Sequence, residues 1–315
     1  MASTNTEIYR PYRGTLSTSG TRFLALVRSG VSAAVKNKLP LVVLFAPPAI
    51  ATVIFSFVVY ARFSLEAGAM PSALGGPSPA GAIAAGFART LIQVRDQIAL
   101  FHVSMSYFTL LVIAWFGAGL IAEDRRAGAH LLYFSRPLTR SGYLAAKFLT
   151  LFLFALIAVL APSLVICTVA TFASPEWSFL KEEGRVVPAS IVYAFLWASV
   201  WSSVMLAISS LFSSRTFALV GSFAFFAVSG AVSVLLVVLQ RDPRFLMLSL
   251  QGHFQRIAVW IFDLRRFGHA SRGSGDHPAF EVGWDVRWSF LAVAAVAGIA
   301  WIILIARVRR LEGST

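Results

Sequence analysis

Six long stretches of the sequence contain no charged residue, and they constrain the fold more than any other feature. They run over residues 39–61, 97–122, 148–175, 186–214, 216–240 and 288–306, and each has at least 19 residues. A helix needs about 20 apolar residues to cross the roughly 30 Å hydrocarbon core of a bilayer. The sequence therefore predicts an all-α membrane protein with six transmembrane helices, at about 39–61, 97–122, 147–173, 187–213, 216–240 and 288–306.

Composition agrees, since 57% of the residues are hydrophobic and only 13% are charged. A seventh uncharged window, residues 67–88, holds Pro71, Pro77 and Pro79 among several glycines. These residues break helices, so this window is expected to be a loop. The regular apolar and polar alternation of a membrane β-barrel is missing, which favours helices.

The distribution of Lys and Arg predicts the orientation. With both termini on one side of six spans, that side carries 15 basic and 4 acidic residues, and the other side carries 12 and 10. Short cytoplasmic loops are enriched in Lys and Arg. We therefore expect a multi-pass protein of the bacterial cytoplasmic (inner) membrane, with both termini cytoplasmic and its positive charge facing membrane lipids rather than nucleic acid. No signal peptide is expected, so the first span directs the chain to the membrane.

Outside the spans, residues 1–20 are expected to be a flexible tail and 21–315 a single transmembrane domain. Residues 21–38 place Phe23, Val27 and Val31 at helical spacing with basic residues between them, which predicts an amphipathic helix on the membrane surface. The longest connection, 241–287, is too interrupted to span and too apolar to be solvated throughout. It is expected to hold one or two interfacial helices before the sixth span.

The segment Ala122–Lys147 joins the second and third predicted spans and combines charged residues with an apolar centre. Glu123 and Asp124 are expected at the start of a short helix, where negative charge suits the helix dipole. The apolar ridge Leu131, Leu132 and Phe134 follows, Ser135-Arg136-Pro137 stops the helix, and Ser141 is a candidate N-cap for the third span. The ridge either packs against the protein's own helix ends or docks a partner.

The pattern of this segment resembles the signature of the permease subunits of type-2 ABC exporters. The matching residues are Glu123, Gly128, Leu131, Leu132, Ser135-Arg136-Pro137, Arg140, Tyr143 and Lys147. The surface helix, the six spans and the interfacial region before the last span are also similar to that family. This sequence departs from the family at Gly128-Ala129-His130, where Gly-Thr is usual.

The resemblance implies that this segment is a coupling helix seated on a separate ATPase subunit. It implies two permease copies, identical or related, with two ATPase copies, and the ATP and Mg²⁺ bound by the partner. No G-x-x-x-x-G-K-[ST] phosphate loop occurs, so this chain is expected to be neither an enzyme nor a cofactor-binding protein. Residues expected in coupling are Glu123, Arg126, Gly128, Leu131, Leu132, Arg136, Pro137, Arg140 and Lys147, the last anchoring the third span.

Other classes of protein remain open. An ion-coupled transporter would bury ionisable groups in its spans, and the six windows hold only His102, expected at the interface. An intramembrane hydrolase would need a histidine near the many span serines, which we interpret instead as interhelical hydrogen-bonders. The main alternative is a membrane scaffold that docks a non-ATPase partner. The substrate is not predicted.

Several single residues have simple expected roles. His253, His269, His277 and Asp276 match no metal-ligand spacing and are expected to be solvated loop residues. Trp177, Trp284 and Trp288 are expected to be interfacial anchors. Pro47-Pro48 could kink the first span.

Overall fold

The computed structural model describes residues 19–36, 38–66, 86, 93–129, 139–264 and 284–312, and the secondary structure in these ranges is helical throughout. In chain order the elements are α1 (Ser19–Lys36), α2 (Lys38–Glu66), α5 (Val94–Arg126), α7 (Arg140–Ala173), η1 (Pro175–Trp177), α8 (Ser178–Glu182), α9 (Val186–Leu211), α10 (Arg215–Gln240), η2 (Pro243–Leu248), α11 (Leu250–Ile261) and α13 (Val286–Glu312).

Six of these helices, α2, α5, α7, α9, α10 and α13, are long and apolar enough to cross a membrane, as predicted. The helices α2, α5 and α13 extend past both ends of their uncharged windows, α7 and α10 begin before theirs, and α9 lies within its own. The helix α2 runs unbroken through Pro47 and Pro48, and the Thr52 hydroxyl donates to the Pro48 carbonyl at 2.7 Å. The packing of neighbouring helices makes such prolines tolerable within a bilayer.

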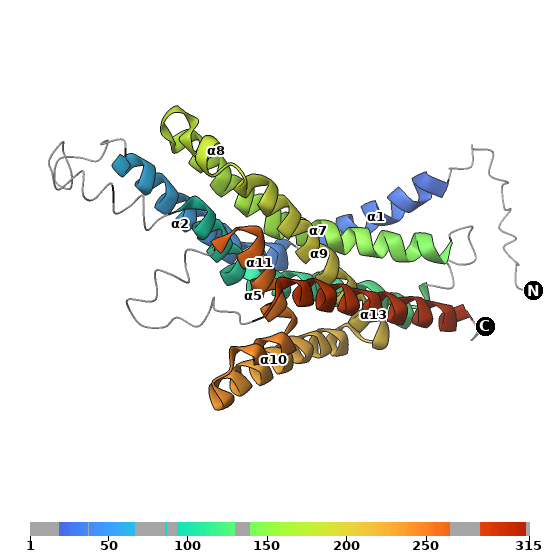
Figure 1. The fold of residues 1–315 in the computed structure, drawn as a ribbon. Helices are drawn as coiled ribbons and strands as arrows, with labels where there is room; N and C mark the ends of the chain where they lie inside the picture. The colour runs from blue at the N-terminus through green and yellow to red at the C-terminus, as the bar shows by residue number, and fades with distance from the viewer. Residues whose placement is uncertain are drawn as a thin grey trace, which may run out of the picture.

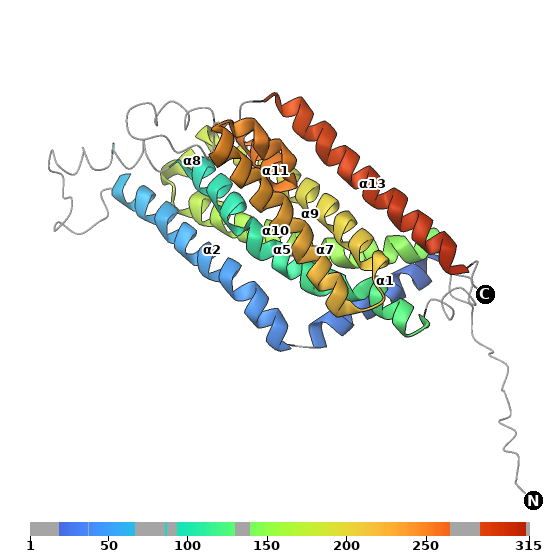
Figure 2. The ribbon, with the colours of Figure 1, turned by 90° about the horizontal axis from the view of Figure 1, so that it is seen from below.

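The helices α5, α7 and α9 pack on one another and form the centre of the bundle, with α2 against α5 and α7, and α13 against α9 (Figures 1 and 2). In the most apolar window of each helix, 61% of α5 and 67% of α9 is buried, but only 11% of α10. The helix α10 therefore offers most of its apolar surface to lipid or to another chain.

Gly117 marks the closest approach within this centre. A Cβ atom added there would lie 2.8 Å from Leu151 Cδ2 of α7 and 3.3 Å from Met205 Cβ of α9. Small residues allow membrane helices to pack at such short range. The absence of a side chain at Gly117 thus brings three helices together.

The helices α1 and α13 reach the same end of the molecule, where α7 begins (Figure 1). The helix α1 packs along α7, and a Cβ atom on its Gly30 would lie 3.0 Å from Thr150 Cγ2. The helix predicted for residues 21–38 is thus present, and its position on a membrane surface stays a prediction. Residues 1–18 lie outside the described residues.

At the opposite end, α11 packs against α13, α5 and α9. Here the structure corrects two expectations. His253 is buried rather than solvated, and Trp284 is buried rather than an interfacial anchor. Both meet Ser289 of α13: the Trp284 indole donates to its hydroxyl at 2.8 Å, and His253 Nδ1 lies 3.3 Å from the same oxygen. His269, Asp276 and His277 lie outside the described residues.

His102 is also buried, and the prediction that it lies at an interface was wrong. Its ring is 5.7 Å from that of Phe262 and 4.9 Å from that of Tyr193, centroid to centroid. The turn that ends α11 covers it, a long-range contact that the sequence of α5 alone does not reveal. Trp177 and Trp288 are exposed, as anchors would be.

A buried arginine joins three elements at this same end. Arg62 of α2 donates to Glu183 at 2.9 Å and to Glu66 at 3.3 Å, and its side chain is only 4% exposed. Glu183 also accepts the backbone N–H of Arg95 at 3.0 Å. The charges next to the first two spans therefore form a network within the protein.

Candidate functional site

The predicted coupling segment leaves the bundle at the last turn of α5. Glu123 and Asp124 belong to this last turn, so the expectation that they begin a helix was wrong. Acidic residues at a helix C-terminus face the negative end of its dipole, so they need cationic partners. Gly128 follows the C-cap residue Ala127 with φ of 64°, a left-handed conformation that glycine adopts without strain and that ends helices.

Asp124 connects the end of α5 to the start of α7. Its Oδ2 atom accepts a hydrogen bond from the Tyr143 hydroxyl at 2.8 Å. The same oxygen forms an ion pair with Lys147 Nζ at 2.7 Å. The Lys147 and Asp124 side chains are 11% and 15% exposed, and Tyr143 is buried. Both ends of the intervening segment are therefore fixed to each other by one carboxylate.

Arg125 fixes the same turn of α5 to α9. Its Nη1 donates to the carbonyl oxygens of Ser210 at 2.6 Å and Phe212 at 3.2 Å, which lie at the end of α9. One turn back, Ser209 donates to the carbonyl of Ala118 at 2.8 Å and accepts from the N–H of Ala122 at 3.2 Å. Helix ends leave carbonyls unsatisfied, and a cation here satisfies them.

Arg215, the first residue of α10, connects that helix to α5. Its guanidinium lies 4.8 Å from the centre of the Trp115 ring and donates to the Trp115 carbonyl at 3.2 Å. It also forms a long ion pair with Glu123, at 3.7 Å, in which both side chains are substantially exposed. The last turns of α5 thus contact α7, α9 and α10 through polar side chains.

These contacts border a cavity of about 360 Å³ at this end of the bundle. Its wall combines small residues of α1 with charged residues of α5, α7 and α10; the charged members are Glu123, Asp124, Lys147 and Arg215. The helix α1 therefore covers the same turn of α5 from which the predicted coupling segment departs.

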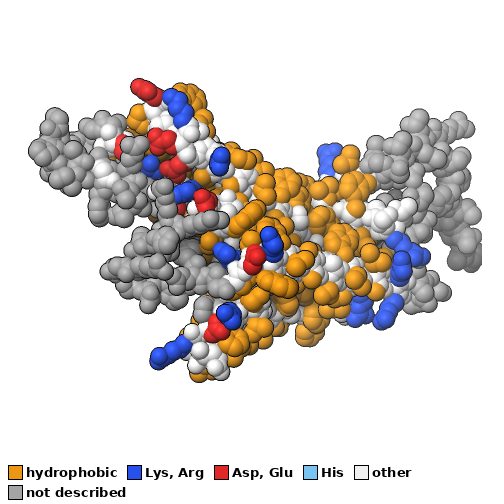
Figure 3. All heavy atoms as spheres, in the orientation of Figure 1, with side chains coloured by type: hydrophobic (Ala, Val, Ile, Leu, Met, Phe, Trp, Pro, Cys, Tyr) orange, Lys and Arg blue, Asp and Glu red, His pale blue; other side chains and the backbone are white. Residues whose placement is uncertain are grey.

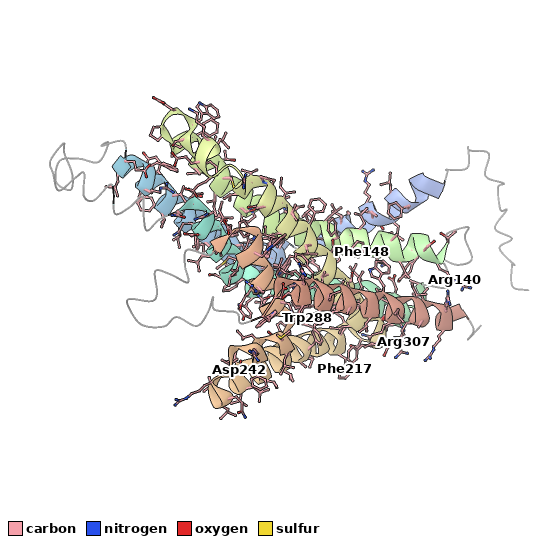
Figure 4. The ribbon with its side chains drawn as sticks, in the orientation of Figure 1. Arg140, Phe148, Phe217, Asp242, Trp288 and Arg307 are labelled. Atoms are coloured by element: carbon pink, nitrogen blue, oxygen red, sulfur yellow. The ribbon has the colours of Figure 1, made fainter. Side chains whose placement is uncertain are left out.

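The N-cap of α7 is Thr139, and the prediction of Ser141 was wrong. The Thr139 side chain accepts the N–H of Gly142 at 3.1 Å, and the helix begins at Arg140. Threonine satisfies a free helix N–H as well as serine does, so residue type alone could not choose between them. Arg140 is exposed and lies at the same end as Arg307 (Figure 4).

The structure brings several predicted site residues into one region. Glu123, Arg126 and Gly128 lie at the end of α5, and Arg140 and Lys147 lie in the first turns of α7. Leu131, Leu132, Arg136 and Pro137 lie outside the described residues. The predicted site omitted Asp124, Arg125, Ser209 and Arg215. The three charged residues of this set stand at the edges of uncharged windows, which was a usable signal.

The span serines have mostly local partners. Ser199, Ser203, Ser210, Ser222, Ser229 and Ser233 each donate to a carbonyl of their own helix. The expected interhelical hydrogen bonds are made by Ser209, which reaches α5. In the described part of the chain, no group of three His, Cys, Asp or Glu residues could hold a metal ion.

Comparison with known proteins identifies one family. A model of ABC-2 family transporter proteins matches residues 87–262, more than half of the chain. The match includes α5, α7, α9, α10, α11 and the predicted coupling segment. No curated protein matches the chain.

Proposed function

Because the chain belongs to the ABC-2 family of transporter proteins, we propose that it is the permease subunit of an ATP-driven exporter, moved by a separate ATPase subunit. The proposed assembly contains two ATPase copies and two permease copies, the second being this chain or a related one. ATP and Mg²⁺ bind to the ATPase. The membrane is the bacterial cytoplasmic membrane, with both termini on the ATPase side.

The observation that carries this proposal is the double contact of Asp124 with Tyr143 and Lys147. A docked subunit can move membrane helices only if the docking segment is held firmly at both ends, since a slack segment absorbs the displacement. Asp124 supplies that connection between α5 and α7. Arg125 and Arg215 extend it to α9 and α10.

Each predicted residue has a proposed role in this mechanism. Leu131 and Leu132 form the apolar ridge that enters the ATPase. The polar surface of the ATPase is contacted by Arg126, Arg136 and Arg140. Of these, Arg126 and Arg140 lie among the described residues and are exposed. Gly128 and Pro137 set the two ends of the docking helix, and Lys147 holds α7 to α5 through Asp124.

Co-purification tests the proposal. The tagged protein, extracted from its native membrane in mild detergent, should retain an ATPase with a Walker A motif in near-equal amount. The double variant Leu132→Asp/Arg136→Glu should lose it. A matched control, Leu248→Asp/Arg244→Glu in η2 at the opposite end, should retain it.

Two results would count against the proposal. If the Leu132→Asp/Arg136→Glu variant still retained the ATPase, docking through this segment would be wrong. If wild-type protein instead retained a partner without nucleotide-binding motifs, the function would be that of a membrane scaffold.

A further inference from the structure

A second pocket, separate from the cavity beside α1, lies between the ends of α5, α9 and α13. Its volume is about 180 Å³. It is lined by Ile121, Arg125, Ser210, Arg307, Val308 and Arg310. Three of the six lining residues are arginines, and none is acidic. Figure 3 shows that basic side chains gather at this end of the molecule on the face in view.

Arg125 is fixed in this pocket by protein contacts. Its Nη1 is held by the carbonyls of Ser210 and Phe212. A guanidinium has five N–H donors in a rigid plane, and in the described part of the chain the donors on Nε and Nη2 have no acceptor. The orientation of the guanidinium is thus set without a ligand.

Arg307 and Arg310 complete the pocket from α13. They are three residues apart, so they lie on the same face of the helix near its C-terminus. Neither forms an ion pair with any side chain that the structure describes. The nearby acids of α5 are engaged elsewhere, Glu123 with Arg215 and Asp124 with Lys147. Three like charges around one small volume repel each other, and a bound anion would relieve that repulsion.

The depth of the pocket favours a lipid over a soluble anion. Arg307 directly follows the uncharged stretch 288–306, so it stands where the membrane-spanning part of α13 ends. Ile121 and Val308 are buried and give the pocket an apolar side. A ligand at this level would sit with its charge among the arginines and its acyl chains along the bundle.

We propose that this pocket binds the phosphate headgroup of an anionic phospholipid in the leaflet on the side of the chain termini. Guanidinium groups match phosphate oxygens in pairs and are weakly hydrated, which suits a partly buried anion site. Basic pockets between helix ends are a recognised form of lipid site. The evidence for this site does not depend on the proposed transport role, although the pocket shares Arg125 with the contacts between α5 and α9. A bound headgroup would hold α13 against α5 and α9.

Binding of fluorescent phosphatidylglycerol to the purified full-length protein in detergent tests this, with phosphatidylcholine of the same acyl chains as the comparison. Phosphatidylglycerol should bind more tightly. Arg307→Gln and Arg310→Gln should each weaken it about fivefold, as expected for about 1 kcal/mol per basic residue. The matched control is Arg309→Gln, which removes the same charge from an exposed position outside the pocket and should have little effect.

Two outcomes would overturn the proposal. Equal weakening by Arg307→Gln and Arg309→Gln would show diffuse attraction rather than a site. Displacement of the lipid by millimolar inorganic phosphate, with the same sensitivity to Arg307→Gln, would assign the pocket to a soluble phosphate.

Discussion

Asp124 and Lys147 lie at opposite ends of the segment that joins α5 to α7, and their side chains meet at 2.7 Å. The carboxylate also accepts the Tyr143 hydroxyl. Because the pair is mostly shielded from water, its attraction is stronger than that of a surface ion pair. The last turn of α5 and the first turns of α7, which flank this segment, are therefore held together by Asp124.

Replacement of Asp124 by Asn should weaken this connection between α5 and α7. We expect a loss of roughly 1–3 kcal/mol in the free energy of unfolding, because Lys147 would keep its charge without an anionic partner. The measurement is thermal unfolding of the purified protein in detergent.

The matched variant is Glu123→Gln, one residue away. Its ion pair with Arg215 is long and exposed, so the loss should stay below about 1 kcal/mol. Equal losses in Asp124→Asn and Glu123→Gln would contradict the special role of Asp124.

Gly117→Val should destabilise the centre of the bundle by about 1–3 kcal/mol, since the new side chain would meet Leu151 and Met205. Gly230→Val in α10 is the control, because nothing lies within 4 Å of a Cβ atom there. Unfolding of both variants in detergent should show a clear difference. An unchanged stability in Gly117→Val would mean that α5, α7 and α9 are not packed as described.

Arg62→Met should cost roughly 2–4 kcal/mol of unfolding free energy, because it leaves the carboxylates of Glu66 and Glu183 without their buried cation. Adding Glu183→Gln should restore part of that loss by removing one of the two charges. A double-mutant cycle measures this coupling. Additive losses would show that the two side chains do not interact.

His253 gives a prediction about pH. Burial lowers the pKa of His253 below its usual 6.5, opposed by a contact with the Met247 backbone. At this residue the unfolded chain therefore binds a proton more readily than the folded one. The contribution of His253 to the free energy of unfolding is fully present above pH 6.5 and is lost as the pH drops below it. His253→Gln should flatten this dependence. The curves of melting temperature against pH for wild type and variant decide it, and parallel curves would rule out His253 as the titrating group.

The sequence predicted the spans well because long uncharged stretches have few alternatives in a bilayer. Their ends were less predictable: α7 begins after Thr139, since any of several hydroxyl residues can cap a helix. The prediction that Glu123 and Asp124 begin a helix was wrong because it placed the end of α5 too early. The apolar window gave no sign that α5 continues through four charged residues to Arg126.

Buried polar residues were the main surprise. His102, His253 and Trp284 were assigned to interfaces or loops, yet all three are buried. The turn that ends α11 covers His102, and His253 and Trp284 contact Ser289 near the start of α13. Their burial depends on contacts between residues far apart in the chain, such as His253 with Ser289. A local pattern carries no information about such contacts. The charges of the candidate site were visible in the sequence, but not which of them would pair.

The central claim is that Leu132 enters an ATPase subunit, and site-specific crosslinking tests it most directly. A photo-reactive amino acid is placed at position 132 and activated in native membranes, and the crosslinked product is identified by mass spectrometry. We predict a crosslink to a chain with a Walker A motif. Crosslinks only to this protein's own helices would show that the ridge packs internally and would contradict the proposed coupling role.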